Sequence, residues 1–218
     1  MPPSSALIFI AVLLPFAAAN TAIDAMSAIS ADDLDCMLGQ NVTRFIAPVW
    51  KTNGIYDSAG IANLEKALSV GYDSVDGVFM PCFTAACAHP ENQIEATLNK
   101  LKTSNIPIGT LWIYAEVGLW PYDNFEENGQ ILASFVSKAK AMGQIVGMLA
   151  SKEGWEANFG TGFTNYADLP LWWTLTDGKA DFSTFETFGG WMTPTMHQYQ
   201  QGHAIGCGGA QIEFSYFP

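Results

Sequence analysis

Leu111-Trp112-Ile113-Tyr114-Ala115-Glu116-Val117 has the aromatic and apolar composition of a buried β-strand, yet it carries an acid near its end. Burying a carboxylate is costly unless the group is paired or takes part in chemistry. In a barrel of parallel strands, active sites lie at the carboxyl ends of the strands. Glu116 is therefore the first candidate for a catalytic residue.

Strand-like runs alternate with segments of helical periodicity on both sides of this heptapeptide. Helices are expected after Ser30, from Ser58 to Gly71, over residues 91–101 and over residues 128–142, and the helical pattern weakens beyond residue 150. Strands are expected at residues 22–26, 43–50, 75–83, 108–117, 145–150, 169–175, 196–200 and 212–217. This alternation is typical of an α/β protein with a parallel sheet. Eight strands favour a modified TIM-like (β/α) barrel with a degenerate second half, and an open doubly wound sheet is the alternative.

The amino-terminal segment predicts entry into the secretory pathway. Residues 6–19 form an apolar run that is short for a membrane span and closes on an Ala-x-Ala site. We expect a signal peptide at residues 1–19 and one domain at residues 20–218. An uncleaved anchor is the alternative, because the usual basic residues are missing.

Four cysteines fit an oxidising compartment. Of the three possible pairings we favour Cys36–Cys207 with Cys82–Cys87, a long-range link and a local clip. Asn41 begins a glycosylation sequon whose occupancy the sequence does not decide.

The net charge of −12 argues against nucleic acid or an anionic membrane as the partner. It also disfavours approach to a polyanionic cell wall at neutral pH, a repulsion that protonation of carboxylates at acid pH would weaken. We therefore expect a secreted protein or one of an acidic lumen, with solubility as the alternative reason for the charge.

The histidines show no metal-ligand spacing and there is no phosphate-binding loop, so we expect no metal and no cofactor.

Strand alternation predicts that several acids meet at one mouth. Tyr114 and Glu116 share a face with Trp112, and Asp24 and Glu213 lie in the first and last strands between apolar neighbours. A carboxylate cluster beside flat aromatic rings suits a sugar-binding cleft. The aromatic candidates for this cleft are Trp120, Trp173 and Tyr199. The alternatives are a solvated strand end for Glu116, a turn or cap for Asp24 and ordinary core for the tryptophans.

The chain resembles lysozymes of glycoside hydrolase family 25, in the branch found in nematodes and amoebae. The matching segments are residues 22–24, 111–116, 171–173, 197–199 and 212–217. The resemblance implies a modified barrel that cleaves the β-1,4 bond between N-acetylmuramic acid and N-acetylglucosamine. It implies Glu116 as the general acid and Asp24 as a second catalytic acid, which stabilises the charged intermediate or positions water. Glu213 stands where the family usually has Asp.

Tyr114 departs from the family pattern, because it occupies the position of the Asp in the Asp-x-Glu motif. In the family this Asp would orient the substrate's acetamido group and stabilise its developing charge, which a neutral phenol does less well.

Two hypotheses about the function follow. The first is a monomeric secreted lysozyme, serving defence or digestion, whose partner is bacterial cell-wall glycan and whose cleft includes Tyr114 and Glu213. The alternative is a catalytically impaired homologue that binds glycan as an immune effector.

Overall fold

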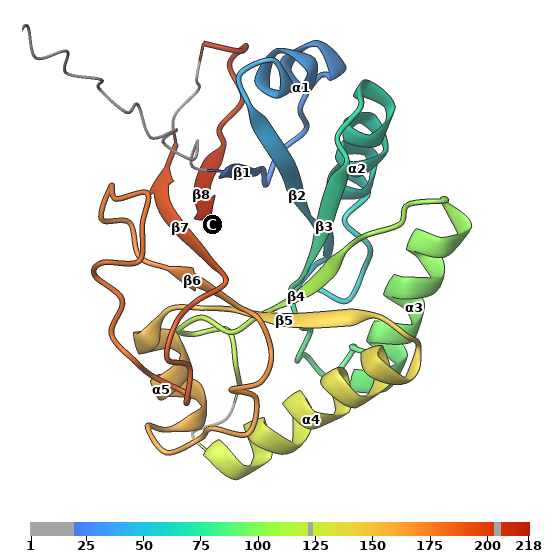
Figure 1. Ribbon diagram of the computed structural model, residues 1–218. Coiled ribbons are helices and arrows are strands. Elements are labelled where there is room, and N and C mark those ends of the chain that lie inside the picture. Colours follow the sequence, from blue (N-terminus) through green and yellow to red (C-terminus); the bar gives the residue numbers. More distant parts are fainter. Residues whose placement is uncertain (1–19, 122–123, 203–205) are drawn as a thin grey trace, which may run out of the picture.

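The computed structural model describes residues 20–121, 124–202 and 206–218, and in these residues eight strands close into a barrel (Figure 1). The predicted signal peptide lies outside the described residues. The strands are β1 (Asn20–Asp24), β2 (Val42–Trp50), β3 (Ser74–Phe79), β4 (Thr110–Tyr114), β5 (Ile145–Ala150), β6 (Leu171–Thr174), β7 (Met196–Gln201) and β8 (Glu213–Phe217). The helices are α1 (Ala31–Leu38), α2 (Ser58–Val70), α3 (Pro90–Thr103), α4 (Phe125–Ala141) and α5 (Lys152–Phe159).

The modified barrel predicted from the sequence is confirmed, including its degenerate second half. Helices follow β1 to β5, whereas in the described residues no named helix follows β6 or β7. In Figure 1 the helices α1 to α4 cover one side of the barrel, and irregular connections surround β6 and β7. None of the helices in the described ranges combines the length and apolarity that a bilayer crossing requires.

The direction of β8 is the feature that the alternating pattern did not predict. Strands β1 to β7 pair in parallel, but β8 runs antiparallel between β7 and β1. The start of β8 therefore lies at the carboxyl end of the other strands. This reversal places Glu213 opposite Asp24 in the strand register.

Several element boundaries also differ from the predicted ones. Strand β3 ends at Phe79 and β4 ends at Tyr114, so Glu116 lies just beyond its strand. Helix α4 begins earlier than predicted, because the Asn124 side chain accepts hydrogen bonds from the backbone of Glu126 and Glu127. Helix α5 was missed, since it is only eight residues long and weakly amphipathic.

Two apolar layers hold the barrel together. The outer layer lies between strands and helices, and the inner layer fills the barrel with one buried side chain from each of the strands β1 to β7. Trp112 and Trp172 meet edge to face inside, with ring centroids 5.7 Å apart. Gly147 on β5 makes room for them, because a Cβ there would lie 2.4 Å from the Trp112 ring. The observed inward direction of Trp112 and Tyr114 agrees with the predicted strand alternation.

Both favoured disulfides are present. Cys36 of α1 pairs with Cys207, which lies ahead of β8, and Cys82 pairs with Cys87 in the segment between β3 and α3.

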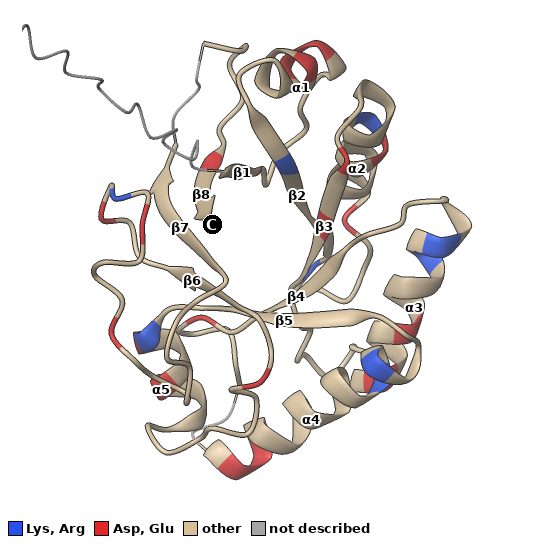
Figure 2. Cartoon of the chain, viewed as in Figure 1, with Lys and Arg blue, Asp and Glu red and all other residues tan. Residues whose placement is uncertain are grey.

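Acidic side chains are spread over loops and helices, as Figure 2 shows, and Lys and Arg are fewer.

Candidate active site

Glu116 lies at the carboxyl end of the barrel, in a hollow of about 390 Å³. The hollow is lined by Tyr114, Glu116, Val117, Thr174, Leu175, Thr176, Gln198 and Gln201. These residues come from the ends of β4, β6 and β7, where the barrel architecture places active sites.

Three donors fix the carboxylate of Glu116. The Ser151 hydroxyl donates to Oε2 at 2.6 Å, the Thr174 hydroxyl donates to Oε1 at 2.7 Å, and the Ser151 backbone N–H also donates to Oε1. Both hydroxyls can rotate and accept instead. The same cage therefore suits an ionised Glu116 and a protonated one.

The start of α5 approaches Glu116 closely. Ser151 caps this helix, since its hydroxyl accepts from the Gly154 backbone N–H at 2.9 Å. A Cβ at residue 154 would lie 2.6 Å from Oε2 of Glu116 and 2.9 Å from the Ala115 carbonyl oxygen. Gly154 thus lets the positive end of the helix approach the carboxylate.

Asp24 and Glu213 form a second acidic group. The side-chain amide of Gln198 donates to Asp24 at 3.0 Å and to Glu213 at 2.6 Å. Burial, and next the charge of Glu213, raise the pKa of Asp24 well above its usual value. Burial also raises the pKa of Glu213. The shift of Asp24 favours its protonated form.

Tyr114 lies in the field of all three acids. Burial, followed by the charges of Glu116, Glu213 and Asp24, raises the pKa of Tyr114 to about 12. The phenol therefore keeps its proton. It can give and accept hydrogen bonds at the mouth but brings no charge there.

The aromatic residues expected to line the cleft are mainly packed into the barrel wall. Trp120 is 7% exposed and donates its indole N–H to the Tyr114 carbonyl at 3.3 Å. Trp173 is 4% exposed and stacks on His197. Tyr199 is half-buried and lies near Phe214. Trp120 thus has almost no free face on which a sugar could stack, and the small exposed part of Trp173 lines a neighbouring hollow.

Three polar residues that contact these acids were not identified from the sequence. Ser151, Thr174 and Gln198 follow or lie within strands β5, β6 and β7. Polar residues are common at strand ends, and these three differ from the others only in lying at the carboxyl edge of the barrel beside the acids. The sequence alone does not show which residues meet at that edge, because their positions depend on how the barrel closes.

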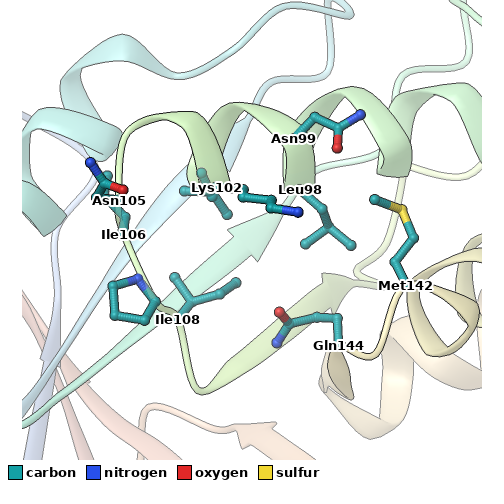
Figure 3. A pocket seen from close by; sticks show the side chains of 10 residues that line it. Leu98, Asn99, Lys102, Asn105, Ile106, Ile108, Met142 and Gln144 are labelled. Carbon is teal, nitrogen blue, oxygen red and sulfur yellow. The ribbon is translucent and has the colours of Figure 1, made fainter.

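A second hollow, of about 440 Å³, adjoins the first and shares Thr174 and Leu175 with it. A larger one, of about 520 Å³, lies at the opposite end of the barrel between α3 and the start of β5 (Figure 3). The side chains that line it include Leu98, Ile106 and Met142 but no acid.

In the described parts of the chain, no cluster of His, Cys, Asp or Glu is suited to hold a metal ion.

A closed barrel with acids at its carboxyl mouth has the architecture and the chemical groups that a glycosidase uses. The family model described as "Lys-1: Lysozyme-like protein 1" matches residues 16–199. The chain belongs to this lysozyme-like family of glycosidases.

Known relatives agree over nearly the whole chain. Lysozyme-like protein 5 of Caenorhabditis elegans is 33% identical over 213 residues, which cover 96% of this chain and 98% of the relative. Probable GH family 25 lysozyme 4 of Dictyostelium discoideum is 30% identical and covers 94% and 97%. The solved muramidase from Trichobolus zukalii shares the fold with a TM-score of 0.70 at 16% identity, covering 92% of this chain and 94% of that one.

Proposed function

We propose that this protein is a secreted lysozyme that cleaves the β-1,4 bond between N-acetylmuramic acid and N-acetylglucosamine in bacterial peptidoglycan. The observation that carries the proposal is the placement of Glu116, an acid caged by three donors inside a hollow at the carboxyl mouth of the barrel. Membership in the lysozyme-like family supports the same reaction class.

In this proposal Glu116 is the proton donor to the glycosidic oxygen. Its protonated form stays oriented, because the hydroxyl that faces the protonated oxygen can accept where it now donates, while the other hydroxyl continues to donate. Donation of its proton to the leaving oxygen then restores the carboxylate, which the backbone N–H of Ser151 also stabilises.

Tyr114 would take the place of the family's Asp beside the reacting sugar. Its hydroxyl can hydrogen-bond to the acetamido group of the substrate, but the neutral ring leaves the developing positive charge to the surrounding acids. Glu213 is half-exposed at the rim and is our candidate for that charge. Asp24 would act behind it by fixing Glu213 and Gln198.

Secretion, with residues 1–19 as a cleaved leader, is part of the proposal. Two disulfides support an extracellular or lumenal setting. The raised pKa of Asp24 fits an acidic compartment, because its protonation leaves Glu213 as the one charge of the pair and so lowers the repulsion between the mouth and an anionic wall.

Clearing of a bacterial cell-wall suspension between about pH 4 and 7 tests the proposal, with mass spectrometry of the borohydride-reduced products. Wild-type protein should clear the suspension and yield fragments that end in reduced muramic acid. Glu116→Gln should lose activity by about 10³-fold, as expected when a general acid is removed. Glu95→Gln, a matched change at an exposed site on α3, should retain full activity.

Two results would contradict the proposal in different ways. Binding to peptidoglycan without clearing by the wild-type protein would favour the glycan-binding alternative. Full clearing by Glu116→Gln would exclude Glu116 as the acid and leave the reaction class intact.

A further inference from the structure

His197 on β7 is fully buried, and both of its ring nitrogens face carbonyl oxygens. Nδ1 lies 2.7 Å from the Asp181 carbonyl oxygen and Nε2 lies 2.9 Å from the Leu175 carbonyl oxygen. A carbonyl oxygen can only accept a hydrogen bond. A neutral imidazole has one N–H and one bare nitrogen, so it can satisfy one of these oxygens, whereas an imidazolium satisfies both.

Two groups beside His197 would stabilise its cationic form against the desolvation that full burial imposes on it. Oδ1 of Asp177 lies 3.8 Å from Nε2, and the Trp173 ring stacks on the imidazole with centroids 3.9 Å apart. Burial alone would raise the pKa of Asp177, but hydrogen bonds from Thr184 and the Lys179 backbone, with the charge of His197, leave it below its usual value.

A second acid near His197, Asp181, also has a pKa below its usual value. Hydrogen bonds within the Ser183 turn, and then the charges of Lys179 and His197, lower the pKa of Asp181. Tyr199 lies 6.2 Å away on β7, and Tyr216 of β8 pairs with His197 in the register. The charges near the ring are thus the two acids Asp177 and Asp181 with Lys179 beside them, and the nearest phenols are those of Tyr199 and Tyr216.

The Leu175 carbonyl links His197 to the mouth of the barrel. Leu175 and Thr176 line the hollow that contains Glu116, and the preceding residue, Thr174, donates its hydroxyl to Glu116. The Leu175 N–H bonds the Gln198 carbonyl at 3.1 Å. A proton on Nε2 therefore holds the backbone of the segment that orients the proposed acid.

We propose that His197, as a doubly protonated imidazolium, is a positioning residue that anchors residues 175–181 and so sets Thr174 and Leu175 against Glu116. The catalytic part of this inference rests on the proposed lysozyme function, whereas the anchoring does not. Loss of one proton turns a ring nitrogen from donor to acceptor opposite a carbonyl oxygen, which releases the segment. Activity then falls once that proton is lost.

The protonation state can be measured on the intact protein by ¹⁵N NMR of labelled histidine. The variants His89→Gln and His203→Gln each remove one of the other two histidine signals, which assigns that of His197 without changing the buried site. Both ring nitrogens of His197 should be protonated at about pH 5, and one should lose its proton as the pH rises. The backbone amide signals of Leu175 and Thr176 should shift with that transition. A neutral imidazole at about pH 5 would overturn the proposal. Backbone amide signals of Leu175 and Thr176 that do not change when His197 loses a proton would also overturn it.

A charge-matched pair of variants tests the effect on the reaction. Asp177→Asn removes the acid that faces Nε2, and Asp168→Asn removes an exposed acid paired with Lys140. In Asp177→Asn the His197 transition and the alkaline limb of kcat/KM should both move to lower pH by about one unit, and in Asp168→Asn neither should move. An alkaline limb that stays in place while the His197 transition moves would refute the positioning role. If the wild-type protein clears no cell walls, the proposed function fails, and the NMR measurement still decides the anchoring.

Discussion

The main chemical question about this barrel concerns one side chain, the neutral phenol of Tyr114. It is a neutral phenol within the field of three carboxyl groups, and its pKa of about 12 keeps it neutral at any physiological pH. The proposed mechanism therefore assigns it hydrogen bonding rather than charge. An acid at the same position would bring a fourth carboxyl to the mouth and would favour the protonated form of its neighbour.

Tyr114→Asp is expected to raise cell-wall clearing by about tenfold or more, because a carboxylate stabilises developing positive charge better than a phenol does. Initial rates of clearing for Tyr114→Asp, Tyr114→Phe and the wild-type protein measure the effect. Tyr114→Phe isolates the hydroxyl, since it keeps the ring. If Tyr114→Asp lowers the rate while Tyr114→Phe does not, a negative charge at this position is harmful and the tyrosine has a role of its own.

The sequence alone indicated Glu116, Asp24 and Glu213, because acids within apolar strands have few structural explanations. Helix capping and strand alternation are local properties, so Ser30 and the inward face of β4 were also identified correctly. Gln198 was not identified, since its value depends on a contact with Asp24, 174 residues earlier. Burial of Trp120 and Trp173 depends on outer packing, which a single sequence does not determine.

At the scale of elements, the reversed strand β8 explains why two acids from opposite ends of the chain face each other. β1 and β8 pair antiparallel, and Asp24 lies opposite Glu213. Burial raises the pKa of both acids, and the charge of Glu213 raises that of Asp24 further, whereas the hydrogen bond from Asp24 lowers that of Glu213. A carboxyl whose pKa is raised on folding binds more protons in the native state than in the unfolded state. Its contribution to stability is therefore full below the unfolded pKa, near 4, and is lost as the pH rises through the folded pKa.

Asp24→Asn should flatten this pH dependence, because the amide does not titrate. Between about pH 4 and 7 the melting temperature of the wild-type protein should fall more steeply than that of Asp24→Asn. Thermal unfolding followed by circular dichroism at several pH values measures both. Asp168→Asn, at an exposed site, should keep the wild-type slope. Identical slopes for Asp24→Asn and the wild-type protein would mean that the pair does not titrate in this range.

Over the whole molecule, the two disulfides close loops of very different length. Cys36 and Cys207 are 171 residues apart in sequence, whereas Cys82 and Cys87 are five apart. In the chain-entropy model a cross-link stabilises the native state by restricting the unfolded chain, and the effect grows with the length of the closed loop. The long link should therefore contribute more.

Replacing Cys36 and Cys207 together by Ser should lower the free energy of unfolding by about 5 kcal/mol. The matched replacement of Cys82 and Cys87 should lower it by about 2 kcal/mol. Urea unfolding without reductant gives both values. Equal losses would mean that residual structure in the unfolded chain, rather than loop length, sets the contribution of each link.

The antiparallel strand β8 has a consequence for synthesis on the ribosome. β1 is made before β8, to which it bonds on one side, so this edge of β1 stays unpaired until β8 has been made. Pairing of strands so distant in sequence is the slow, entropically costly step of folding. Because the same pairing brings Glu213 to Asp24, a nascent chain that lacks β8 has neither a closed barrel nor a complete mouth. The proposed hydrolase would thus stay inactive until β8 has been synthesised.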